Sequence, residues 1–320
     1  MNLAKLAQLA NVSVSTVSKA FSDSPEISGQ TREIIFNVAK EHGCFDKYYK
    51  PVYSKKVIAV ICPEMLGIHY TQMATFLSEK ISSRNGTMLL SIDEFSEEKN
   101  QELIDYYTTF CRADGIIVIE PSAVIKNNTD IPIVQIGADN ESKNVDCVNV
   151  VVNEAMDSAF EYLLNSNYEK IGFIGEKYAR PEYEYFISTA EKFNVNLSKM
   201  HISVSNMRFY DAGYYGMEQF IKNKDIPEVI FAAYSHIAVG ILQRLKEEKL
   251  SVPEDVSVIC MDDISSVPYS DIKLSCIKMH LDEVCDTALD LLYQKIDGNH
   301  NKAKRSVSII REFLTGESLL

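Results

Sequence analysis

The stretch from Ser13 to Phe21 places hydroxyl groups and one amine on a single helical surface. At 3.6 residues per turn Val17, Ala20 and Phe21 fall on one side. The opposite, outward side then carries Val14, Ser15, Ser18 and Lys19, with Thr16 beside them. Hydroxyls donate and accept hydrogen bonds and an ammonium group donates them, so this pattern indicates recognition of a polar partner.

Three short helices are predicted to position this surface. The first shows apolar residues at helical spacing, Asn11 suits a tight turn, and Ser13 can cap the second helix. A third helix is predicted over 31–42, with Ser28 near its start, Gly43 at its end and an apolar face of Ile34, Ile35, Val38 and Ala39. Helices this short need a shared core. Two of them joined by a tight turn predict a helix-turn-helix, and an ordinary three-helix cap on a larger domain is the alternative.

The N-terminal sequence resembles the DNA-binding head of the LacI/GalR family of bacterial repressors. Residues 3–20 read LAKLAQLANVSVSTVSKA and match the family pattern LAxxAxVSxSTVSxA. Ile27–Ser28, Thr31–Glu33 and Glu41–Gly43 continue the match. The resemblance implies that the second helix enters the major groove of double-stranded DNA.

The resemblance also assigns two roles within the head. It places Val14, Ser15 and Lys19 where base edges are read, and lysine can donate to guanine O6 and N7. Hydroxyls and backbone amides are expected to hold phosphates, which fixes the register without reading the sequence. The residues at those positions are Ser13, Thr16, Ser18, Ser22, Ser28 and Thr31.

Composition narrows the class of protein further. The chain has 320 residues, 32 basic against 45 acidic, which argues against a protein that coats nucleic acid non-specifically. The first fifty residues hold six basic and five acidic residues, so one head should bind DNA weakly and a homodimer is expected. The seven scattered cysteines suit a reducing cytoplasm and show no metal-binding spacing. We expect no signal peptide, membrane segment or cofactor.

Residues 44–56 are interpreted as a linker that departs from the family pattern. The family has Tyr-x-Pro-Asn and then a hinge helix whose leucine wedges into the minor groove. Here Asp46 and Lys47 replace Pro-Asn, Pro51 interrupts any helix, and Tyr53 lies near the leucine position. The minor-groove kink is therefore in question.

The remainder predicts an α/β body of two doubly wound parallel sheets. Non-alternating apolar runs predict buried strands, and helical stretches separate them. Strands are expected at 57–62, 88–90, 115–119, 131–136, 171–174, 202–205, 229–232, 256–260 and 307–310, and helices at 70–84, 97–112, 153–165, 183–193, 212–222, 235–249 and 281–296. The segment 250–264, LSVPEDVSVICMDDI, resembles the same family, whose body is a periplasmic-binding-protein-like pair of lobes.

The domain boundaries follow from these patterns. We predict a helix-turn-helix head at 1–46, a linker or degenerate hinge at 47–56, and an effector-binding and dimerisation body at 57–320. Within the body, lobe 1 is expected at about 57–150 and 278–305, and lobe 2 at about 151–277 and 306–320.

Candidate effector contacts lie at strand ends, where open α/β sheets bind ligands. Asp262 ends a strand at the family's ligand-binding aspartate, and Tyr70 follows the first strand. Elsewhere the family pattern is degraded: Tyr234 stands in the place of an expected Asn-Asp pair, Arg180 is offset, and Arg208 lies near the stacking position of lobe 2. These losses weaken the case for a simple sugar and leave an anionic or aromatic effector, a nucleoside or another metabolite open.

Two other classes of function remain as alternatives. Catalysis is not expected, because the sequence holds no P-loop, no GxSxG elbow and no HExxH motif. A regulator whose lobes serve dimerisation alone, with no effector, is the stronger rival. The prediction is a dimeric, cytoplasmic, sequence-specific transcriptional regulator, a repressor, that binds a pseudo-palindromic operator.

Overall fold

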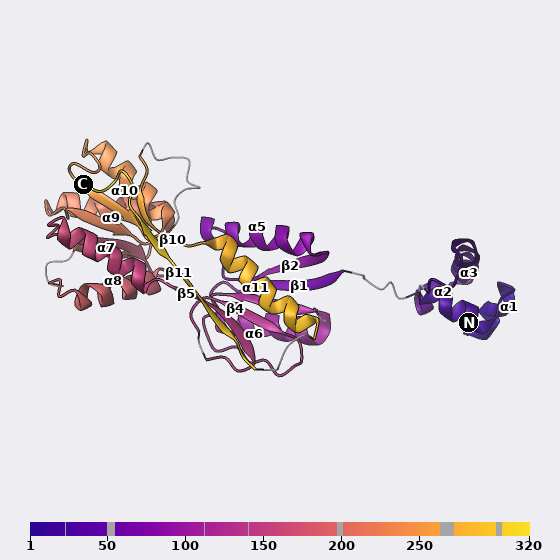
Figure 1. Ribbon diagram of the computed structural model, residues 1–320. Coiled ribbons are helices and arrows are strands. Elements are labelled where there is room, and N and C mark those ends of the chain that lie inside the picture. The colour runs from indigo at the N-terminus through magenta and orange to yellow at the C-terminus, as the bar shows by residue number, and fades with distance from the viewer. Residues whose placement is uncertain are drawn as a thin grey trace. The chain divides into compact units, whose positions relative to one another are not determined.

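The computed structural model describes residues 1–22, 24–49, 55–111, 113–139, 141–196, 201–262, 272–298 and 303–320. The chain divides into two compact units, Met1–Lys56 and Val57–Leu320 (Figure 1). The first unit is helical and the second is an α/β body. In the described part of the chain, every helix is too short or too polar to cross a membrane.

The head consists of α1 (Leu3–Leu9), α2 (Val14–Phe21), α3 (Gly29–Glu41) and the single turn α4 (Phe45–Tyr48). The predicted Ser13 cap is confirmed, and Asn2 and Ser28 cap α1 and α3 in the same way: each of the three side chains accepts a hydrogen bond from the backbone amide three residues ahead. Asn11 and Gly43 take left-handed backbones, with φ of 53° and 59°. The small shared core is built from Leu6, Ala7, Val17, Ala20, Phe21, Ile35 and Ala39.

Two details of the head differ from the prediction. Ile34 is 50% exposed and lies outside the core, because Ile35 and Ala39 are enough to cover the contact with α1 and α2. Residues 44–49 pack onto the head, where Phe45 stacks on Tyr49 at 4.6 Å and the Tyr48 hydroxyl donates to the Met1 carbonyl at 2.6 Å. The folded head thus continues past residue 46, and Pro51 and Tyr53 lie outside the described residues.

The first lobe is built on a sheet with the strand order β11-β5-β4-β3-β1-β2. Alternate residues of β1 enter two different cores: Ile58 and Val60 pack with α5 and α11, whereas Ala59 and Ile61 pack with Ile104 of α6. This explains why its strands are apolar without alternation. Its elements are β1 (Lys56–Cys62), α5 (Ile68–Ser83), β2 (Gly86–Ile92), α6 (Glu97–Asp105), the π-helix η1 (Tyr106–Cys111), β3 (Gly115–Ile119), β4 (Ile133–Ile136), β5 (Val145–Val151), α11 (Leu281–Ile296) and β11 (Ser306–Ile310).

The second lobe repeats this plan with the order β12-β10-β9-β8-β6-β7. Strand β12 runs antiparallel to β10, and the other strand pairs are parallel. Its elements are α7 (Asn153–Asn165), β6 (Ile171–Glu176), α8 (Arg180–Lys192), β7 (His201–Ser205), α9 (Phe209–Lys222), β8 (Val229–Ala232), α10 (Ser235–Glu247), β9 (Ser257–Cys260), β10 (Ser275–Lys278) and β12 (Glu312–Leu314).

The chain passes between the two sheets three times, as Figure 1 shows near β5, β10 and β11. One boundary differs from the prediction, which placed 306–310 in lobe 2. Strand β11 pairs in parallel with β5, from Ser306 beside Cys147 to Ile310 beside Val151, and so belongs to the first sheet. The third crossing therefore lies at Arg311, between β11 and β12.

Candidate functional site

The surface of α2 has the polar face that its spacing predicts. Val14 is 46% exposed, and Ser15 and Ser18 are also exposed. Lys19 forms an ion pair with Glu26, a contact the sequence prediction did not include. Because this pair is formed within the head, DNA would have to compete with Glu26 for the lysine.

The remaining predicted hydroxyls occupy helix ends. Ser13 Oγ accepts from the Thr16 amide at 3.0 Å and lies 2.7 Å from the Thr16 hydroxyl. Ser28 and Thr31 repeat this arrangement at 3.2 and 2.8 Å at the start of α3. The Ser22 hydroxyl donates to the Lys19 carbonyl at 3.2 Å, at the end of α2. Two capped helix N-termini with exposed hydroxyls are suited to hold phosphate oxygens.

A cavity of about 400 Å³ lies between the two lobes of the body. Four of the five predicted effector contacts line it, namely Tyr70, Arg208, Tyr234 and Asp262. Arg180, the fifth predicted contact, is not among the residues that line the cavity. Its side chain is 80% exposed and pairs with Glu184 one turn along α8 at 2.7 Å, so it points away from the cavity.

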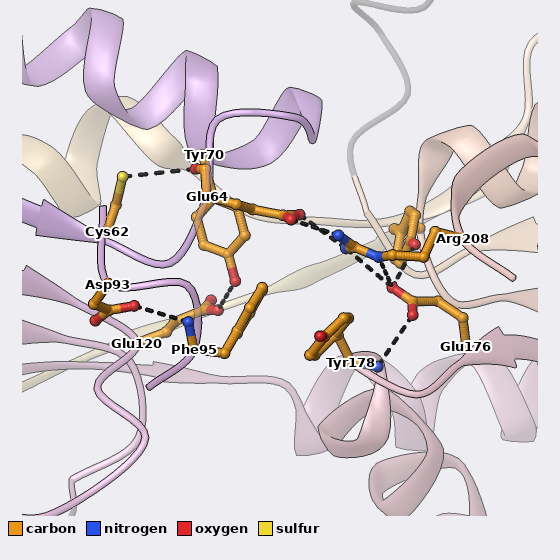
Figure 2. Close-up of polar contacts among 10 residues, drawn as sticks. Cys62, Glu64, Tyr70, Asp93, Phe95, Glu120, Glu176, Tyr178 and Arg208 are labelled. Carbon is orange, nitrogen blue, oxygen red and sulfur yellow. Dashed lines mark hydrogen bonds and ion pairs between the residues drawn. The ribbon is translucent and has the colours of Figure 1, made fainter. Parts of the chain in front are cut away.

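Arg208 joins the two lobes across this cavity (Figure 2). Its guanidinium donates to both carboxylate oxygens of Glu64 in lobe 1, at 2.6 and 3.0 Å. It also donates to Glu176 in its own lobe at 3.3 Å, and the Tyr234 hydroxyl donates to the same Glu176 oxygen at 2.8 Å. The Glu176 side chain is fully buried, and the two carboxylates raise the pKa of Arg208 well above its usual value, although burial opposes them.

Aromatic rings close the cavity beside this ion pair. Phe95 of lobe 1 stacks on Tyr178 of lobe 2, with ring centroids 4.4 Å apart, as Figure 2 shows. Asp93 fixes the loop by accepting from the Phe95 amide at 3.0 Å and from Asn100 at 2.6 Å. Phe95 and Phe209 have φ of 60° and 55°, which non-glycine residues rarely adopt. Such strain is concentrated at ligand-binding sites.

Glu120 is an ionised carboxylate of the cavity. The Tyr70 hydroxyl donates to it at 2.6 Å, and His69 Nε2 lies 3.4 Å from its other oxygen. Burial raises the pKa of Glu120, but His69 and Tyr70 outweigh burial and lower it to about 2. Burial likewise opposes the positive charge of His69, yet its contact with Glu120 raises the His69 pKa above the usual value. The Glu120 side chain keeps 40% exposure because it lines the cavity, whereas the His69 side chain is 18% exposed.

Glu182 has a different environment in the same cavity. Burial raises its pKa to about 7, with Arg311 opposing and Glu120 adding to the rise. Arg311, at the third crossing, donates from Nη1 to the Met261 carbonyl at 3.1 Å, beside Asp262. Burial lowers the pKa of His236, against the pull of Asp262.

The sequence prediction missed most of the carboxylates that line the cavity. Glu120 directly follows β3, Glu64 lies two residues after β1, and Glu176 ends β6, so the strand-end rule used for Asp262 could have found all three. Glu182 lies in the first turn of α8 and carries no such signal. No group of three or more His, Cys, Asp or Glu side chains is arranged to hold a metal in the described ranges.

Two family descriptions match the chain. Residues 2–45 match the bacterial regulatory proteins of the lacI family, and residues 160–319, half of the chain, match a periplasmic binding protein-like domain. The chain belongs to the LacI family of bacterial regulatory proteins. The predicted fold class, a helix-turn-helix head on a periplasmic-binding-protein-like body, is thereby confirmed, and this LacI-family chain is a DNA-binding transcriptional regulator.

Similar proteins cover both units of this LacI-family chain. The probable HTH-type transcriptional repressor ExuR of Bacillus subtilis is 25% identical over 335 residues, covering 98% of the chain and 97% of the relative. Two solved structures share the fold. A LacI-family regulator from Silicibacter pomeroyi has a TM-score of 0.78 and 17% identity, and the match covers 99% of both chains. A lac repressor dimer bound to operator and an anti-inducer has a TM-score of 0.74 and 16% identity, and the match covers 100% of this chain and 99% of the other.

Proposed function

We propose that this chain is a transcriptional repressor that binds a pseudo-palindromic operator as a cytoplasmic homodimer and responds to a small molecule in the inter-lobe cavity. The observation that carries the proposal is the exposed face of α2, framed by the Ser13–Thr16 and Ser28–Thr31 caps. The exposed face of α2 supplies hydrogen-bond donors for base edges, and the two helix caps beside it supply sites for phosphate oxygens. The relative and the operator-bound lac repressor agree with this role.

The direct test is to select bound fragments from random double-stranded DNA with the full chain. Two symmetric heads should enrich a pseudo-palindrome whose half-sites are separated by one helical turn or a multiple of it. Sedimentation of the protein alone and with the enriched duplex measures the stoichiometry. A monomer that prefers no selected duplex over genomic DNA would contradict the proposal.

Affinity for the enriched operator should depend strongly on salt. Each phosphate neutralised by the protein releases counterions, so log affinity should fall linearly with log salt, with a slope of roughly −0.9 per phosphate contact. Titrations between 50 and 200 mM salt by fluorescence anisotropy measure the slope. A flat response would rule out phosphate contacts by the helix caps.

The effector part of the proposal rests on the cavity and on Asp262, which is 9% exposed at the end of β9. We expect Asp262→Ala to abolish the response of operator binding to the compound that raises the melting temperature most in a metabolite panel. Operator binding itself should remain, because Asp262 belongs to the body and the DNA-reading face to the head. A response that survives in Asp262→Ala would move the effector away from this cavity.

A second candidate is a repressor without an effector. The Glu64–Arg208 bridge and the Phe95–Tyr178 stack favour it, because these residues of the cavity already bind each other across the two lobes. Thermal melts distinguish the two functions, since a saturating effector should raise stability by about 3 kcal/mol. Unchanged melts across sugars, nucleosides and phosphorylated metabolites would favour the effector-free repressor.

A further inference from the structure

The charged groups of the cavity are strongly unbalanced. Two arginines, Arg208 and Arg311, line it together with His69 and His236. Against them stand the carboxylates of Glu64, Glu120, Glu176, Glu182 and Asp262. Even with Glu182 protonated and with both arginines and one histidine charged, the other four carboxylates leave the lining negative. An anionic ligand would therefore enter against repulsion.

Several of the cavity's hydrogen-bond donors are engaged by its own carboxylates, although Arg311 Nε is buried without a hydrogen-bond partner among the described residues. Arg208 donates to Glu64 and Glu176, and Figure 2 shows both contacts. The Tyr70 hydroxyl donates to Glu120, and the Tyr234 hydroxyl donates to Glu176. A carboxylate has about four lone-pair sites, so these acids keep acceptor capacity after their present bonds. The ligand that suits this lining brings donors of its own.

Glu182 is the carboxyl group best placed to receive a positive charge. No lysine or arginine forms an ion pair with it within the described ranges, and the groups that act on it electrostatically are Arg311, Glu120 and His69. Its neighbour Glu120 is held by His69 and Tyr70. Glu182 and Glu120 line the same cavity and act on each other electrostatically, so an ammonium group near them would be attracted by two carboxylates.

The aromatic rings of the cavity already bind a cation. The Arg208 guanidinium lies 4.6 Å from the Tyr178 ring centroid and 4.3 Å from that of Phe209. Ring faces attract cations through their quadrupole and also pack against the apolar face of a sugar-like ring. Tyr70 and Tyr185 add further aromatic lining, so the cavity offers ring surface beyond the two rings that contact Arg208.

We propose that the cavity binds a small polyhydroxylated molecule that carries a protonated amine, an amino sugar in chemical class, with the amine held between Glu182 and Glu120. The inference rests on the proposed function, because it names the effector class of the same cavity. The hydroxyl groups would donate to the remaining carboxylates, and a volume of about 400 Å³ limits the ligand to a small molecule.

Matched sugar series test the class on the full chain by calorimetry and thermal shift. The galactose, glucose and mannose series each compare the 2-amino sugar, the neutral sugar and the uronic acid, so that the charge is the main variable. We expect the amine to bind tightest in at least one series, about tenfold more tightly than its neutral partner. A uronic acid that binds tightest, or amino sugars that fail to bind in all three series, would overturn the proposal.

The pH dependence supplies an independent readout. Below pH 7 Glu182 holds a proton that a bound ammonium must expel, so amine affinity should rise on the order of tenfold from pH 5.5 to 7.0. Glu120 stays charged over this range and Tyr70 stays neutral, and an arginine such as Arg311 is a permanent cation. The pKa of His69 is raised, and any proton that His69 loses as pH rises acts in the same direction as Glu182.

Two variants separate Glu182 from these neighbours. Glu182→Gln should remove both the preference for the amine and most of its pH dependence. Glu184→Gln is the matched control, since Glu184 is two residues away on α8 and pairs with the exposed Arg180. If Glu182→Gln keeps the amine preference, the assignment of Glu182 is wrong. Operator selection with the wild-type protein tests the repressor function separately. If an operator is enriched but no amino sugar binds, only the ligand class is wrong; if no operator is enriched, the repressor function itself fails.

Discussion

Arg208→Ala should destabilise the body by about 3 kcal/mol, because it leaves buried carboxylates without their cation. The side chains of Glu64 and Glu176 are only 11% and 0% exposed, so water would stabilise their charges less well than the guanidinium does. For a unit of this size the loss corresponds to a fall in melting temperature of roughly 10 °C. Differential scanning calorimetry of the full chain measures it.

Arg180→Ala is the matched control for this substitution. Its ion pair with Glu184 lies on the surface, so the change should stay within about 0.5 kcal/mol. Adding Glu176→Gln to Arg208→Ala should restore part of the lost stability, because the uncompensated charge is removed. Equal melting temperatures for the two arginine variants would show that the inter-lobe bridge contributes nothing to folding.

These two arginines also show where sequence reasoning reaches its limit. Both lie near degraded family motifs, in the segments that follow the predicted strands 171–174 and 202–205. Packing decides which carboxylate each arginine pairs with. Arg208 precedes α9 and reaches Glu64, 144 residues away in sequence, whereas Arg180 begins α8 and pairs with Glu184 of its own helix. No local pattern distinguishes the two outcomes, because the deciding partner belongs to the other lobe.

The helices of the head could be predicted because their ends are fixed by residues close together in the sequence. Its caps and turn depend on contacts three or four residues apart, such as Ser13 with Thr16 and Ser28 with Thr31. Strand β5 was missed because Asp146 interrupts its apolar pattern. That carboxylate is fully buried, and it is neutralised by Lys295 at 2.6 Å and Arg305 at 2.9 Å, both about 150 residues later. Short-range rules therefore predict caps well and buried ion pairs poorly.

Lys19→Ala should weaken operator binding by about 1–3 kcal/mol per half-site, and so by roughly 2–6 kcal/mol for a dimer. The lysine lies on the outward face of α2, where the proposed contact is a base edge, so the variant should also lose preference at one base pair in each half-site. Anisotropy titrations against the selected operator and its single-base variants measure both effects. Equal losses on every sequence would make Lys19 a phosphate contact.

Glu26→Gln should act in the opposite direction, because it releases Lys19 from its ion pair within the head. Both side chains are largely exposed, so the pair is weak and the gain for a dimer should be about twofold to tenfold. Lys40→Ala, which removes a lysine that lies over Phe45, is the control for a general loss of positive charge and should change affinity less than about threefold. If Glu26→Gln fails to strengthen binding in wild type, or strengthens it equally in Lys19→Ala, the ion pair does not restrain the lysine. A gain that requires Lys19 would show that the head binds DNA by exchanging an internal carboxylate partner for the operator.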